Sequence, residues 1–107
     1  MDKNQRIEAL NVLIAEDPSD PFLQYGLVLE LAKEDSDLGM KRWLELVDNF
    51  SDYLPSYQLA GQACKDNGDK EKAIQIWRQG LELANFQSDF HARKELMSSI
   101  QNAMIED

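Results

Sequence analysis

The fold is decided by residues 57–81, which read YQLAGQACKDNGDKEKAIQIWRQGL. Two runs of apolar residues at helical spacing stand on either side of the turn-forming pair Gly68-Asp69. Small residues lie beside large ones in both runs, as in Ala60-Gly61 before the turn and in Ala73, four residues before Trp77, after it. Two helices approach closely only where a side chain is nearly absent, and an aromatic ring then fills the space beside the crossing. The stretch therefore predicts a hairpin of two closely packed helices.

A second copy of this pattern precedes the first. Four residues recur at a spacing of 34: Gly39, Met40, Trp43 and Val47 correspond to Ala73, Ile74, Trp77 and Leu81. Three residues further upstream recur at a spacing of 35: Phe22, Gly26 and Leu29 correspond to Tyr57, Gly61 and Cys64. The difference predicts one extra residue in the turn of the first hairpin, within residues 33–37. Because glycine inside a helix costs about 0.5–1 kcal/mol relative to alanine, Gly26 and Gly61 are expected to mark close helix crossings.

These motifs resemble the tetratricopeptide repeat family, in particular short bacterial members with about two repeats and flanking helices. The resemblance covers about residues 7–84 and implies an all-α protein, a right-handed α-α superhelix of helical hairpins without a β-sheet. Residues 1–107 would form a single domain. Its expected parts are an N-terminal half-repeat helix at about 3–16, repeat 1 at about 20–50, repeat 2 at about 54–84 and a C-terminal capping helix at about 88–105.

Apolar periodicity and turn residues also predict where the helices begin and end. After a helix ending near Pro18, further helices are expected at residues 20–33, 37–50, 56–66, 69–84 and 88–104. Asp37, Asp69 and Ser88 are the expected N-cap residues, because their side chains can accept a hydrogen bond from the first helical turn.

Charge and composition limit the classes of partner. The formal net charge is −9, and residues 17–52 alone carry nine acidic and three basic side chains. Like-charge repulsion argues against nucleic acid and anionic membranes as partners. The N-terminus shows no signal peptide and the chain contains no apolar run of about 18 residues, so we expect a soluble cytoplasmic protein.

Residue types that carry chemistry are scarce. His91 is the only histidine and Cys64 the only cysteine, so neither a disulfide nor a zinc cluster can form within the chain. We expect His91 on a helix surface and Cys64 in the core, where the repeat places a large residue. Asp35, Asp37, Asp66 and Asp69 lack the loop pattern of a calcium site and fall at interhelical turns. The sequence therefore predicts no catalytic residue, metal or cofactor, and it favours packing roles for Trp43 and Trp77.

The resemblance implies a function in protein binding. Members of the family generally hold a partner segment in a concave groove lined by the first helix of each repeat. Counting from Gly26 and Gly61 gives the expected groove residues: Asp20, Leu23, Leu27 and Glu30 from repeat 1, and Pro55, Gln58, Gln62 and Lys65 from repeat 2. The partner would be a protein or peptide of basic, amphipathic character.

Two alternatives stay open. Leu23 and Leu27 can serve a second copy of the chain as well as a partner, so a self-associating structural subunit is the alternative function, with an enzyme third. These leucines can also be covered by the N-terminal helix. We expect a monomer, because the half repeat and the final helix can cover both ends of so short a stack.

Overall fold

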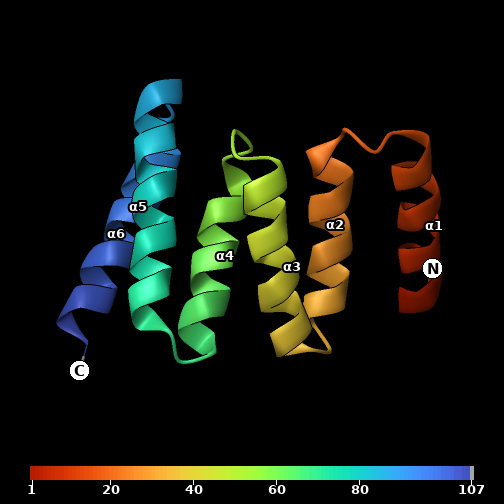
Figure 1. Cartoon of the computed structure of the whole chain (residues 1–107), viewed down its shortest axis with the longest axis horizontal. Helices are drawn as coiled ribbons and strands as arrows, with labels where there is room; N and C mark the ends of the chain where they lie inside the picture. The colour runs from red at the N-terminus through yellow and green to blue at the C-terminus, as the bar shows by residue number, and fades with distance from the viewer. Residues whose placement is uncertain (107) are drawn as a thin grey trace.

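The computed structural model of the chain describes residues 1–106, and these form six helices and no strand. The helices are α1 (Lys3–Glu16), α2 (Pro21–Ala32), α3 (Ser36–Asn49), α4 (Pro55–Asp66), α5 (Lys70–Gln87) and α6 (Phe90–Ile105). They stand side by side in chain order, with α1 at one end of the stack and α6 beside α5 at the other (Figure 1). Short connections require successive helices to run antiparallel. The all-α prediction is confirmed. No helix among the described residues is both long and apolar enough to span a membrane.

Aspartates begin most of the helices. The carboxylates of Asp35, Asp69 and Asp89 accept hydrogen bonds from the backbone N–H of the residue three positions on, at 3.0 Å each. The predicted N-cap Asp69 is thus confirmed, and Asp37 and Ser88 are wrong. Asp35 has the extended backbone that an N-cap needs, which places Asp37 inside the first turn of α3.

Ser88 ends α5 instead of beginning α6. Its backbone is left-handed, with φ of 56°, and its N–H donates to the carbonyl oxygen of Asn85. The N–H of Asp89 reaches back to Ala84. This pair of bonds is a Schellman motif, which satisfies the last carbonyls of a helix and lets α5 continue to Gln87, beyond the predicted end. Gly68, with φ of 86°, closes α4 in the same way.

The two hairpins keep one spacing throughout. Their first helices begin at Pro21 and Pro55, and their second helices begin at Ser36 and Lys70, so both offsets are 34. Residues 33–35 and 67–69 form turns of equal length. The predicted extra residue in the first turn is therefore wrong, and so is the 35-residue alignment of the first helices.

The second hairpin packs as predicted. Trp77 is 1% exposed, and its indole ring lies against the backbone of Gly61, where any Cβ atom would overlap it. Trp77 Nε1 also donates to the carbonyl oxygen of Gln58 at 3.2 Å. Gly61 is therefore a close crossing. Gly26 is not one, since a Cβ there would lie 3.5 Å from Leu10 Cδ2, an ordinary contact.

The core is concentrated in α3 to α6. Trp43, Leu46 and Val47 of α3 are buried, as are Leu96, Ile100 and Ala103 of α6. In contrast, α1 has no buried residue and α2 has only Val28. The final helix therefore covers the core well, whereas the N-terminal helix is attached only at the surface of α2.

Candidate functional site

Helices α2, α4 and α6 line a surface with two adjoining pockets. The first pocket, here called the α6 pocket, encloses about 290 Å³ and is lined by Tyr25, Leu54, Pro55, Gln58, Leu59, Asp89, Ala92, Glu95 and Leu96. The second, here called the α3 pocket, encloses about 280 Å³ and is lined by Leu29, Ala32, Lys33, Ser36, Gly39, Met40, Trp43, Leu59, Gln62, Ala63 and Asp66. Both include Leu59, so they meet at that side chain. We call the two pockets together the groove.

Aromatic rings support the groove from below. Tyr25 packs edge-on against Trp43, with ring centroids 5.2 Å apart, and against Tyr53 at 5.9 Å. Such edge-to-face pairs add to the stabilisation from burial. Burial raises the pKa of Tyr25 above its ordinary value of 10.0. The Tyr25 ring, packed against two aromatic neighbours, forms an uncharged wall of the α6 pocket.

The polar groups of the groove are mostly acceptors. Gln58 donates from Nε2 to Ser99 Oγ at 2.8 Å, but its Oε1 is buried and has no hydrogen-bond partner. Gln62 donates to Asp66 Oδ1 at 2.9 Å. The lining contains three carboxylates, those of Asp66, Asp89 and Glu95, and one ammonium group, that of Lys33. The groove is therefore apolar at its floor and acidic at its rim.

The structure places the predicted residues of α4 partly in the groove. Gln58 and Gln62 line it, and Pro55 belongs to the α6 pocket. Lys65 lies outside both pockets and forms an ion pair with Glu106 at 2.9 Å. Counting from Gly61 thus selected three residues of α4 that line the groove, and whether they contact a partner stays a prediction.

The predicted residues of α2 lie elsewhere. Leu27 lines a separate pocket with Asn11 and Ile14 of α1. Leu23 is half-buried and lines none of these pockets, and Asp20 is the N-cap of α2, accepting from the Phe22 N–H at 2.9 Å. These residues are not brought together with Gln58 and Gln62. Whether any of them contacts a partner stays a prediction.

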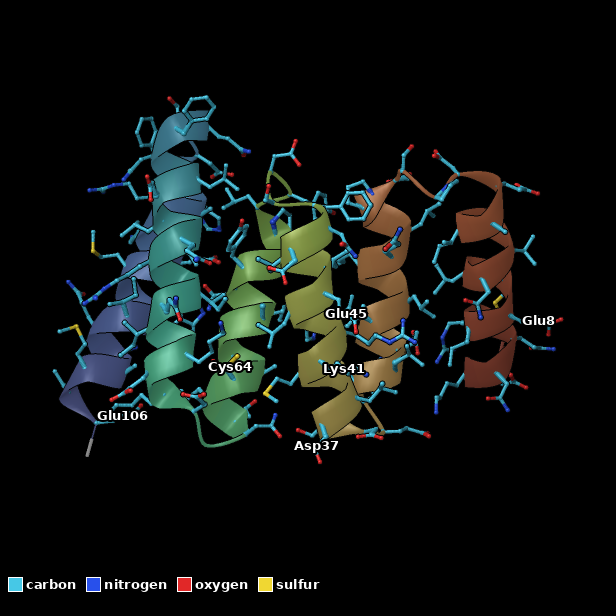
Figure 2. The ribbon with its side chains drawn as sticks, viewed as in Figure 1. Glu8, Asp37, Lys41, Glu45, Cys64 and Glu106 are labelled. Atoms are coloured by element: carbon cyan, nitrogen blue, oxygen red, sulfur yellow. The ribbon has the colours of Figure 1, made fainter. Side chains whose placement is uncertain are left out.

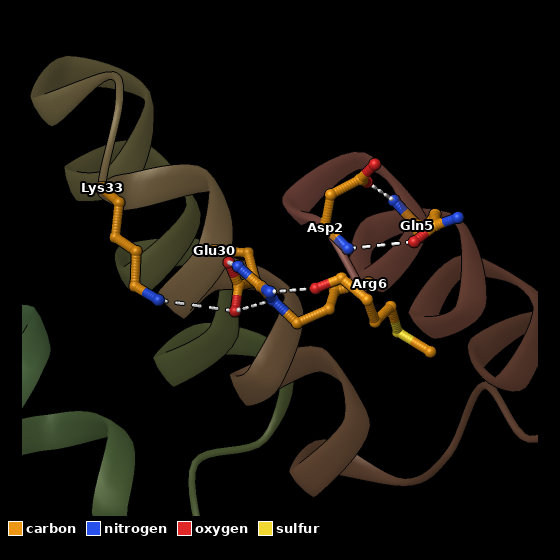
Figure 3. A network of polar contacts seen from close by, with 6 residues as sticks. Asp2, Gln5, Arg6, Glu30 and Lys33 are labelled. Atoms are coloured by element: carbon orange, nitrogen blue, oxygen red, sulfur yellow. Dashed lines mark hydrogen bonds and ion pairs between the residues drawn. The ribbon is translucent and has the colours of Figure 1, made fainter.

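Glu30 belongs to a polar network that attaches α1 (Figure 3). Its side chain is 13% exposed and accepts from Arg6 Nε at 3.1 Å, and Lys33 Nζ lies 3.4 Å away. The hydrogen bond from Arg6 is the main cause that holds the pKa of Glu30 below its ordinary value. Lys3 forms a second ion pair, with Glu34 in the turn that follows α2. The carboxylate of Glu30 is therefore occupied within the chain.

Sequence reasoning missed three residues of α2 that line the groove: Tyr25, Leu29 and Ala32. The sequence signal that could have identified them is the 34-residue spacing of the two tryptophans. At this spacing Tyr25, Leu29 and Ala32 correspond to Leu59, Ala63 and Asp66, which line the same groove from α4.

The remaining reactive side chains are placed as predicted. Cys64, labelled on α4 in Figure 2, is fully buried, and burial raises its pKa, so the thiolate is disfavoured. His91 is exposed on α6 with Nε2 2.7 Å from Glu95 Oε1. No group of three or more potential metal ligands occurs among residues 1–106. Cys64 and His91 both lie outside the two pockets of the groove.

Comparison with solved structures bears on the fold. A crystal structure of a tetratricopeptide repeat domain protein from Salinibacter ruber matches with a TM-score of 0.75 and 26% identity, over 80% of this chain and 98% of that one. A solution structure of a tetratricopeptide repeat domain protein from the same organism matches with a TM-score of 0.77 and 29% identity, over 84% and 93%. The chain has a tetratricopeptide repeat fold.

A third solved structure is also similar in fold to this chain. A protein from Bordetella parapertussis, solved in solution, matches with a TM-score of 0.75 over 92% of this chain and 86% of that one. At 23% identity this likeness concerns the fold alone. No protein-family model matches the sequence, and no curated protein matches it either.

Proposed function

We propose that the chain is a non-catalytic interaction module that holds a segment of a partner protein in the groove between α2, α4 and α6. The tetratricopeptide repeat fold supports a role in protein–protein interaction in general. The observation that carries the specific proposal is the apolar row along the two pockets, which is formed by the half-buried Tyr25 and Leu59 and the exposed Leu29. Leu29 stays 37% exposed although it lies beside the buried Trp43.

The size of the groove limits the affinity. Two pockets of this volume accept a few side chains of a partner, which is a small interface by the standards of stable complexes. We therefore expect binding in the micromolar range, about −8 kcal/mol. Such an affinity suits a reversible adaptor.

A pair of matched substitutions tests the proposal. Leu29→Glu places a charge in the α3 pocket, and Val12→Glu places the same charge on α1, where Val12 is 54% exposed and outside the groove. Partners are captured from the native cell with the parent chain and with both variants. We expect Leu29→Glu to reduce recovery of a specific partner at least about tenfold, or 1.4 kcal/mol, and Val12→Glu to leave it unchanged. The opposite ranking of the two variants would contradict the proposal.

Self-association is the second candidate, and one observation favours it. Phe86 and Phe90 flank the turn between α5 and α6 and are 86% and 75% exposed. Exposed aromatic pairs of this kind are typical of contact surfaces. This candidate differs from the first in that it uses the end of the stack and leaves the groove free.

A further inference from the structure

The α6 pocket has apolar walls that suit a long aliphatic stem. Leu54, Leu59 and Leu96 form its sides, and the Tyr25 ring forms part of its wall. Its volume of about 290 Å³ is roughly twice that of an engineered apolar cavity that binds benzene. One large side chain of a partner can therefore enter it.

The polar atoms of the same pocket are mainly acceptors, and two of them have partners within the chain: Asp89 Oδ1 accepts from the Ala92 N–H at 3.0 Å, and Glu95 Oε1 lies 2.7 Å from His91 Nε2. Asp89 and Glu95 contribute carboxylates, and no basic residue lines the pocket. The buried Gln58 Oε1 has no donor. No ion pair among residues 1–106 joins Lys94 to Glu95, although both line the neighbouring surface. The pocket lining thus has two carboxylates, each with one oxygen that is engaged within the chain, and a buried amide oxygen without a donor. The two charged side chains that line the pocket are both carboxylates, so the pocket lining favours a cation.

We infer that the α6 pocket is the anchor site for an arginine side chain of the partner segment. The inference rests on the proposed function and names the partner's chemistry. The aliphatic stem lies along the leucines, and the guanidinium group meets the carboxylates of Asp89 and Glu95. Arginine fits better than lysine because its planar group carries five donors and stacks on aromatic rings such as that of Tyr25.

The test uses a defined probe and the full chain. The capped peptide acetyl-Leu-Arg-Leu-amide is titrated into ¹⁵N-labelled protein, and a peptide with citrulline in place of arginine is the matched control, since citrulline keeps the shape and loses the charge. We expect saturable shifts of the Leu54, Leu59 and Ala92 amide signals with the arginine peptide. The citrulline peptide is expected to bind at least about fivefold more weakly, because charge-assisted hydrogen bonds are the stronger ones.

Variants of the pocket locate the effect. The double change Asp89→Asn and Glu95→Gln removes both charges, and asparagine keeps the N-cap of α6. We expect it to reduce the preference for arginine over citrulline to below about twofold, because the charge-assisted bonds are gone. Glu82→Gln on α5, outside the groove, is the control and keeps the preference.

Two results would overturn the inference: equal binding of both peptides, or no saturable shift at these residues. A different result would contradict the proposed function: Val12→Glu loses the captured partner and Leu29→Glu retains it. If the arginine preference is absent while Leu29→Glu still abolishes capture, the groove binds a partner and only the anchor assignment is wrong.

Discussion

Glycine at position 61 shows how one missing side chain fixes a helix crossing. The Trp77 indole occupies the place where a Cβ atom of residue 61 would stand. Gly80 has a similar role on α5, since a Cβ there would lie 2.7 Å from Tyr57 Cβ. Gly26 has no such neighbour, and it lies inside α2, where glycine weakens a helix.

The contrast between two glycines gives the first prediction. Gly61→Ala is expected to destabilise the fold by about 1–3 kcal/mol, because the new methyl group overpacks the crossing with Trp77. Gly26→Ala is expected to stabilise it by up to about 1 kcal/mol, because alanine favours the helix and the site has room. Urea unfolding followed by circular dichroism measures both. If Gly61→Ala stabilised the fold or left its free energy of unfolding unchanged, the helix crossing would not depend on this contact.

Single residues also show what the sequence could predict about the site. The burial of Trp43, Trp77 and Cys64 followed from the repeat, because each stands at a position that faces a neighbouring helix. The groove residues of α2 did not follow. A one-residue correction of the register leads from Leu27 only to the buried Val28, whereas Tyr25 and Leu29 correspond to Leu59 and Ala63, which counting from Gly61 did not select on α4 either.

At the scale of the helix, α1 is the element without a buried residue. Its ion pairs join Arg6 to Glu30 of α2 and Lys3 to Glu34 of the following turn, and Leu10 packs beside Gly26. Its outer side faces solvent, as the labelled Glu8 in Figure 2 illustrates. By comparison, α6 has three buried residues. The two flanking helices therefore differ in how firmly they are attached.

Acid is expected to loosen α1. The pKa of Glu30 is lowered from its ordinary value of 4.5 in the folded chain, chiefly by the hydrogen bond from Arg6. A lowered folded-state pKa stabilises the docked helix at pH values above 4.5, and this stabilisation is lost as the pH falls through the lowered value. Hydrogen-exchange protection factors measured between neutral and acid pH should fall for α1 before they fall for α4.

Glu30→Gln is the control for this prediction. The variant has no carboxylate to protonate at residue 30. Its α1 should therefore be less protected from exchange at neutral pH, and this protection should no longer fall as the pH is lowered. If the protection of α1 fell with pH in Glu30→Gln as it does in the parent chain, the loss of protection would be due to other carboxylates.

Helix ends were predicted in part from the sequence. An aspartate before an apolar run identified the start of α5. The start of α3 was misassigned because Asp35 and Asp37 are both suitable caps in sequence, and only backbone conformation distinguishes them. The end of α5 was missed because a serine in left-handed conformation takes the place that glycine usually fills.

At the scale of the molecule, the charge and the covered faces favour a monomer. Like charges oppose association of a chain with a net charge of −9, and α1 and α6 occupy both ends of the stack. Sedimentation equilibrium is expected to give the mass of one chain, 12.3 kDa, across a wide concentration range. A stable dimer would contradict this. If Phe86→Ser dissociated it and Leu23→Glu did not, the dimer contact would lie at the α5–α6 turn.

Methyl NMR shows directly whether the groove between α2, α4 and α6 holds a partner segment. The captured partner segment is added to protein labelled at leucine, isoleucine, valine and alanine methyl groups. We expect shifts of the Leu29, Leu59 and Ala63 signals, with those of Val12 and Leu27 unchanged. Shifts confined to Val12 and Leu27 would contradict this expectation and place the partner on the side of α1.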